Sequence, residues 1–120
     1  MVSNSLHAQD AKVYFMRSEG FQAPAAAFTV FIDHKLVGRL NNKKFSKYNI
    51  QPGEHTFSTQ FSGKKSSEKA EKIEVKTEAG KTYYIQVSFK HGLFQNKLKF
   101  KQIDEDDAKK LLTGLKEMQS

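Results

Sequence analysis

Alternation of apolar and polar residues with a period of two runs from residue 11 to residue 103 and constrains the fold more than any other feature. Successive side chains of a β-strand point to opposite faces, so this pattern predicts half-buried strands. Two clear examples are residues 11–16, with Val13 and Phe15 on one face, and residues 82–89, whose apolar face carries Tyr83, Ile85, Val87 and Phe89. The sequence therefore predicts an all-β domain over residues 10–103.

Turn signals separate the alternating segments. Asp33 and His34 interrupt residues 27–40 and predict a hairpin. Its turn has either two residues or one more, because His34 stands where a two-residue turn favours Gly. Pro52 and Gly53 predict a tight turn with positive φ at Gly53, and Gly80 marks another turn. Short strands joined by such turns predict an antiparallel β-sandwich of about seven or eight strands.

The period changes after residue 103. Acidic residues at 104–107 precede apolar residues at helical spacing, as the helix dipole favours. We predict an amphipathic helix over residues 104–120, packed on the sandwich or extending from it. Its apolar face is a candidate partner-docking surface formed by Leu111, Leu112, Leu115 and Met118.

Residues 1–9 are predicted to be a signal-peptide remnant or a disordered tail. Leu6-His7-Ala8 before Gln9 is similar to the end of a secretory signal. We therefore expect an exported protein, periplasmic or on the cell surface, and a cytoplasmic one if these residues are not a signal remnant. No segment has the roughly 18 consecutive apolar residues of a transmembrane helix.

Catalytic motifs find little support in the sequence. The chain has no cysteine, and its histidines stand singly. Asp33 beside His34 suggests part of a catalytic triad, but the pair lies in a predicted exposed turn, where Asp is favoured for its hydrogen bonds to local backbone. We expect no catalytic, cofactor-binding or metal-binding residues, and hence a protein that is not an enzyme.

The positive charge leaves a binding role open. Twenty basic residues against 13 acidic ones give a net charge of +7, which attracts polyanions without specificity. A candidate surface for a polyanion or glycan comprises Lys90, Phe94, Lys97, Lys99 and Lys101, and the alternative is that the lysines only solubilise outer faces. We do not expect nucleic acid as a partner, because 18 of the 20 basic residues are lysines, which lack the bidentate geometry of arginine.

Aromatic residues at outward positions are a further candidate for stacking on ligands. The alternation assigns this position to Tyr14, Phe31, Tyr48 and Tyr84.

Five segments in order resemble the bacterial envelope family catalogued as domain of unknown function 2846. They are "AKVYFMRSEGF", "FTVFIDHKLVGRL", "NIQPGEHTFS", "EAGKTYYIQVSF" and "LKFKQIDEDDAKKLL". The resemblance implies a small transthyretin-like or immunoglobulin-like sandwich, similar also to PEGA-type domains, that is exported and has no assigned reaction. It offers no site residues to transfer, and the lipid-anchored form does not carry over because the chain lacks cysteine.

Together these observations predict a non-catalytic, exported binding or structural module of the bacterial envelope that engages a protein partner. Two alternatives remain open. One is binding of a polyanion or glycan through the lysine-rich strand face, and the other is a role as an accessory subunit of a larger envelope assembly.

Overall fold

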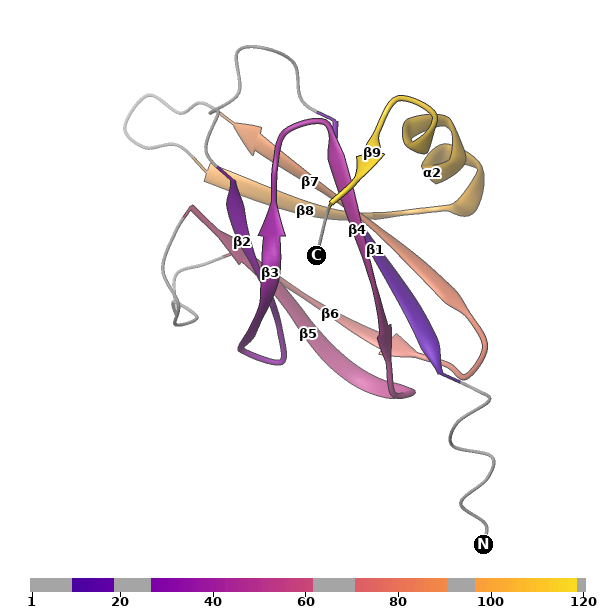
Figure 1. Cartoon of the computed structure of the whole chain (residues 1–120). Coiled ribbons are helices and arrows are strands. Elements are labelled where there is room, and N and C mark those ends of the chain that lie inside the picture. The colour runs from indigo at the N-terminus through magenta and orange to yellow at the C-terminus, as the bar shows by residue number, and fades with distance from the viewer. Residues whose placement is uncertain (1–9, 19–26, 62–70, 91–96, 119–120) are drawn as a thin grey trace, which may run out of the picture.

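The computed structural model describes residues 10–18, 27–61, 71–90 and 97–118, without the side chains of Lys90 and Lys97. Over these residues the chain forms nine strands and one helix (Figure 1). The predicted tail at residues 1–9 lies outside them. The elements are β1 (Ala11–Arg17), β2 (Phe28–Ile32), β3 (Lys35–Leu40), β4 (Lys44–Ile50), β5 (Gly53–Gln60), β6 (Glu71–Thr77), β7 (Thr82–Lys90), β8 (Lys97–Ile103), α2 (Glu105–Leu112) and β9 (Lys116–Glu117).

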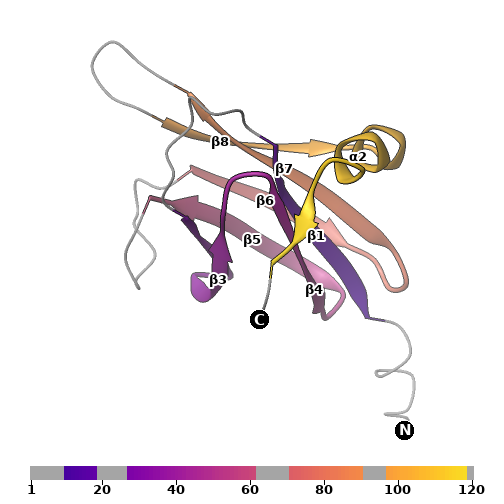
Figure 2. The same cartoon turned by 45° about the horizontal axis from the view of Figure 1, so that its top comes forward.

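The strands form two sheets that pack face to face, so the predicted sandwich is confirmed (Figure 2). One sheet has five strands in the order β8-β7-β1-β4-β9, and the other has four in the order β3-β2-β5-β6. Most neighbours are antiparallel, as predicted. Two pairs are parallel, β1 with β7 and β4 with β9, and the sequence pattern did not predict them.

The core lies between the two sheets and is built from the inward positions of the alternating segments. Phe15 is fully buried at its centre, with its ring centroid 5.4 Å from that of Phe57 on the opposite sheet. Two aromatic residues predicted at outward positions differ from expectation. Phe31 is not part of the core cluster but is fully buried, whereas Tyr48 packs against the core, with its ring centroid 5.9 Å from that of Phe15. Parity misplaces Tyr48 because β4 is read from an irregular segment with few apolar residues.

The turns follow the expected chemistry. Gly53 and Gly80 have positive φ, as predicted. The β2–β3 hairpin has a two-residue turn, the shorter of the two alternatives, because both Asp33 and His34 adopt positive φ, of 53° and 69°. Asp and His are among the residues that enter this region most readily without being glycine.

The predicted helix over residues 104–120 is too long. Asp104 caps α2 by accepting a hydrogen bond from the Asp107 N–H at 2.9 Å, and the helix ends at Leu112. Gly114 and Leu115 then donate to carbonyls three residues back, which closes the last turn. Met118 donates its N–H to the Phe45 carbonyl at 2.8 Å, so the segment that follows becomes a short strand on the edge of β4. Residues 116–117 form a strand there because β4 pairs with β1 along one edge only, which leaves its other edge to β9.

Among the described residues, no helix is both long and apolar enough to cross a membrane.

Candidate functional site

The predicted lysine stripe lies on the outer face of the five-stranded sheet. Lys99 stands opposite Ser88 and Lys101 opposite Gln86, and both lysines are exposed. The backbone register places Lys90 opposite Lys97, at the end of the β7–β8 pairing. Their side chains lie outside the described part of the structure, and so does Phe94. The structure therefore describes a basic surface at Lys99 and Lys101.

An aromatic row lies on the same outer face, across three neighbouring strands. The ring of Tyr14 lies 5.2 Å from that of Tyr84 and 5.8 Å from that of Phe45, with interplanar angles of 35° and 25°. The rings of Tyr14 and Phe45 are stacked, whereas the rings of Tyr14 and Tyr84 are tilted against each other. Tyr14 thus packs against an aromatic ring on each of its two neighbouring strands.

The predicted docking face is divided by the end of the helix. Leu111 and Leu112 lie on α2 and are half-buried, and α2 runs beside β7 (Figure 1). Leu115 and Met118 lie beyond the helix, and Met118 packs against the core. These four residues therefore do not form one helical surface, and docking through Leu111 and Leu112 stays a prediction.

Asp33 forms a close pair with a histidine that the sequence does not place next to it. Its carboxylate Oδ2 lies 2.6 Å from Nδ1 of His55, and Oδ1 accepts a hydrogen bond from the Thr56 N–H at 2.9 Å. The other ring nitrogen, Nε2, lies 2.6 Å from the Gln51 carbonyl oxygen. Both nitrogens of His55 therefore face acceptors, which the doubly protonated imidazolium satisfies best. The pair ties the β2–β3 turn to β5 and leaves neither nitrogen free to act as a base.

The pKa values of both groups agree with this arrangement. Burial by itself lowers the pKa of His55, but the Gln51 carbonyl and the Asp33 carboxylate outweigh burial and raise the pKa above its ordinary value of 6.5. Burial by itself raises the pKa of Asp33, but the Thr56 amide and His55 outweigh it and lower the pKa below 3.8. The contact therefore favours the charged form of each group.

We expect this pair to make stability depend on pH. Because the pKa of His55 is raised on folding, its contribution is full below pH 6.5 and is lost as the pH rises through the folded value. The contribution of Asp33 is full above pH 3.8 and is lost as the pH falls through its lowered value. The free energy of unfolding, measured with urea from pH 5 to pH 9, should decrease above about pH 6.5.

The substitution Asp33→Asn tests this origin of the pH dependence. Asn keeps the left-handed turn but removes the carboxylate that favours the imidazolium. In this variant the free energy of unfolding should fall less steeply above about pH 6.5 than in wild type. The difference should be measurable but no more than about 1 kcal/mol, since the Asp33 side chain is 47% exposed. Glu54→Gln is the matched control, because this exposed carboxylate next to His55 in the chain is not among the groups that raise the pKa of His55, and it should leave the slope unchanged. An unchanged slope in Asp33→Asn would contradict the assignment.

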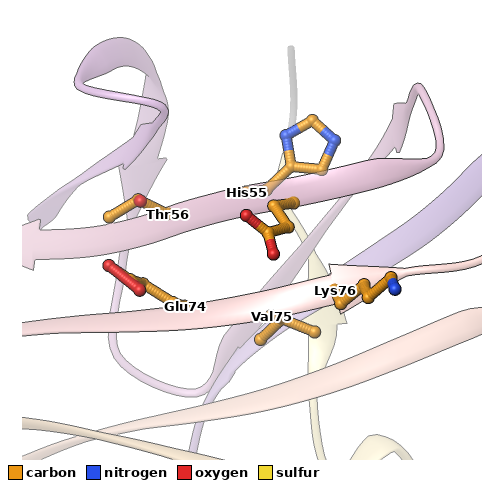
Figure 3. Close-up of a pocket in the computed structure, with 6 residues that line it drawn as sticks. His55, Thr56, Glu74, Val75 and Lys76 are labelled. Carbon is orange, nitrogen blue, oxygen red and sulfur yellow. The ribbon is translucent and has the colours of Figure 1, made fainter.

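A shallow hollow of about 410 Å³ adjoins His55 and is lined entirely by β5 and β6 (Figure 3). Its walls carry the charged side chains of Glu54, Glu74 and Lys76 with Thr56 and Val75. The carboxylates and the ammonium belong to exposed side chains. In the described part of the chain, no three His, Asp or Glu side chains converge as metal ligands would. The hollow thus holds no nucleophile paired with a free base.

A second hollow of about 500 Å³ opens between β3 and the edge formed by β4 and β9. We call it the β3–β4 slot, and it is lined by residues 37–39, residues 46–48, Glu117 and Met118. Sequence reasoning did not find it. The available signal was the composition of residues 34–50, which contain Lys35, Arg39, Lys43, Lys44 and Lys47 but no Asp or Glu.

Comparison with known proteins identifies the family. The model of the family described as "Protein of unknown function (DUF2846)" matches residues 7–99, which is more than half of the chain. The chain belongs to the DUF2846 family. The resemblance stated from its sequence segments is therefore confirmed.

One curated relative is similar to most of the chain, and its name states no activity. This chain is 29% identical over 101 residues to an "Uncharacterized protein" of Haemophilus influenzae, an alignment that covers 84% of this chain. The aligned region spans 57% of that relative's length, so this chain corresponds to only part of it. No solved structure matches the chain.

The DUF2846 match includes only some of the residues that line the β3–β4 slot. It ends at residue 99, within β8. The slot residues of β3 and β4 lie inside the match, whereas Glu117 and Met118 follow it. The slot of this DUF2846 protein therefore combines residues from inside and outside the matched region.

Proposed function

We propose that this protein is a non-catalytic binding module of the bacterial envelope that engages a protein partner along β3. The observation that carries the proposal is the exposure of two adjacent apolar side chains on this strand. Leu36 is 44% exposed and Val37 is 37% exposed, whereas most large apolar side chains of the described residues are covered.

The position of β3 supports strand addition. It is an end strand of the four-stranded sheet, and among the described elements it pairs only with β2. The end strands β6 and β8 lie side by side and close the opposite side of the sandwich. An edge strand presents unpaired backbone N–H and C=O groups, which an extended partner segment can bind as an added strand.

A binding role also fits the arrangement at His55. An acid–base catalyst needs a nitrogen within reach of a substrate proton. Both ring nitrogens of His55 instead lie 2.6 Å from oxygen atoms of the protein. This geometry supports a structural function for the histidine.

Photo-crosslinking in living cells tests the partner and its site. A photoreactive amino acid at Leu36 should form a discrete adduct, and the same group at the exposed Lys76 of β6 should not. Val37→Pro removes a backbone donor at the bulge of β3, where proline is tolerated, and should abolish the adduct without unfolding the protein. Equal adducts at both positions, or an adduct that survives Val37→Pro, would rule out binding along β3.

Location in the envelope rests on Leu6-His7-Ala8 before Gln9, which is similar to a signal-peptide end. The native gene carrying a C-terminal epitope should yield protein in the periplasmic or surface fraction of its host. Recovery with the cytoplasmic marker would overturn this part of the proposal and leave partner binding to be decided by crosslinking.

A second candidate function is binding of a polyanion or glycan by the basic outer face. Its support is the exposure of Lys99 and Lys101 on one face of β8. The double variant Lys99→Gln with Lys101→Gln should leave a heparin column at a lower salt concentration than the matched double variant Lys72→Gln with Lys76→Gln on β6, because fewer counterions are released. Identical elution of the two would reduce the stripe to ordinary surface charge.

A further inference from the structure

The edge of β4 that faces away from β1 is paired over only part of its length. β9 pairs there with Lys44 and Phe45, at the start of β4. Met118 adds a hydrogen bond from its N–H to the Phe45 carbonyl at 2.8 Å. Among the described residues, no strand pairs with the rest of β4 at this edge. Most of the edge thus lies open beside a strand of two residues.

The direction of the backbone shows which groups lie at the open edge. Alternate residues of a strand send their N–H and C=O groups to opposite sides. Lys12 of β1 stands opposite Asn49 of β4, yet it donates its N–H to the Lys81 carbonyl on the side of β7. Asn49 and, two residues earlier, Lys47 therefore direct their backbone groups away from β1. These are the groups that an added strand can bind.

Room for an added strand lies directly ahead of β9. Because β9 runs parallel to β4, its continuation passes along residues 46–48, which line the β3–β4 slot of about 500 Å³. On the side of β3, the Tyr48 hydroxyl fills the space at Gly38 where a Cβ atom would stand. A strand that enters the slot therefore stays at the edge of the sheet.

Few contacts hold β9 in its place. Both of its residues, Lys116 and Glu117, are exposed. The Lys116 N–H donates a long hydrogen bond of 3.3 Å to the Lys43 carbonyl. The Glu117 carboxylate lies 4.0 Å from the Lys47 ammonium, with both side chains about half exposed, so this contact is weak. Met118 supplies the apolar contact with the core. A segment that repeats these contacts and continues along β4 can displace β9.

We propose that β9 is exchanged for a longer strand of a partner protein, which runs parallel to β4 along its open edge. β9 indicates the chemistry of this strand, since Glu117 stands beside Lys47 on the outer face and Met118 packs inward. The partner strand therefore alternates acidic and apolar residues. Residues 34–50, with only positive formal charges, favour such a strand and disfavour pairing of two β4 edges with each other. The exchange goes beyond the proposed binding along β3 and does not depend on it.

Hydrogen exchange of the free protein, followed by ¹⁵N-edited NMR, tests whether the edge is open. The amides of Ser46 and Tyr48 face β1, whereas those of Lys47 and Asn49 face the edge. The edge amides should have protection factors at least roughly tenfold lower than the other two. Equal protection of all four amides would mean that the edge is already covered and would overturn the proposal.

A peptide Thr-Glu-Met-Glu-Val-Thr with blocked ends serves as the partner probe, because it extends the alternation of β9 to about the length of an ordinary strand. In excess it should raise the protection factors of Lys47 and Asn49 at least roughly tenfold. Replacing its Met with Pro removes the N–H that binds the Phe45 carbonyl and should abolish the effect. Replacing both Glu with Lys should weaken binding at low salt.

Variants that loosen β9 should bind the peptide more tightly. Met118→Ser should raise its affinity roughly tenfold, because β9 competes for the start of the same edge. Ile73→Ser is the matched control, since Ile73 is also partly buried against the core but lies on β6, and it should leave the affinity unchanged. Glu117→Lys, at an exposed position, should act in the same direction as Met118→Ser without changing the core.

Three results would contradict the exchange. Lower affinity in both Met118→Ser and Glu117→Lys would mean that β9 forms part of the site and does not block it. No peptide binding even in Met118→Ser would exclude strand addition at β4, while the crosslinking at Leu36 decides binding along β3 separately. A dimer in analytical ultracentrifugation that Met118→Ser dissociates would replace the partner strand with β9 of a second copy.

Discussion

Phe15→Ala should destabilise the protein by about 3–5 kcal/mol, as expected for removal of a large aromatic side chain from a core. Phe15 is fully buried, and its ring lies within 6.3 Å of the rings of Tyr48, Phe57 and Phe100, centroid to centroid. These three residues belong to both sheets, so they cannot all move to fill the space left behind. Urea unfolding monitored by circular dichroism measures the change.

Leu36→Ala is the control for this substitution. Leu36 also lies on a strand but is 44% exposed, so its truncation should change the free energy of unfolding by less than about 1 kcal/mol. A loss in Phe15→Ala no larger than in Leu36→Ala would mean that the two sheets do not pack around Phe15.

Arg17→Ala should be the next most damaging change, at about 3 kcal/mol or more. Arg17 is fully buried, donates a hydrogen bond from Nη1 to the Leu40 carbonyl at 2.9 Å, and places its guanidinium carbon 3.6 Å from the centroid of the Phe28 ring. The substitution removes packing and a desolvated cation–π contact, and it takes the guanidinium donor away from a buried carbonyl.

Arg39→Ala controls for the loss of an arginine from the same region, because Arg39 is exposed. It should change the melting temperature by only a few degrees. Arg17→Lys refines the result, since the ammonium keeps the charge but loses the planar contact with Phe28, and it should fall between wild type and Arg17→Ala. Equal melting temperatures for Arg17→Ala and Arg39→Ala would exclude Arg17 as a link between the sheets.

The alternating pattern predicts the strands and the core well because both depend on which residues leave water. Residues 82–89 and the turn at Gly53 follow directly from local chemistry. Arg17 illustrates the limit. Its position has the inward parity of Val13 and Phe15, yet the charge argues for solvent, and only the Leu40 carbonyl and the Phe28 ring across the sandwich reverse that preference.

The candidate sites were harder to predict because they depend on contacts between distant segments. The sequence suggests a pair of Asp33 with its neighbour His34. In the fold, the antiparallel pairing of β2 and β5 instead brings Asp33 to His55. The β3–β4 slot requires β9, a two-residue strand that no periodicity can indicate.

The parallel pairing of β1 with β7 bears on when the protein can fold. β1 sits in the middle of its sheet, between β4 and β7, and its register places Lys12 beside Thr82. A chain synthesised from its N-terminus cannot pair β1 with β7 until residues near 90 have left the ribosome, and contacts between such distant residues slow folding. The order of the strands thus delays compaction, and this delay fits a protein that, as proposed, crosses a membrane before it folds.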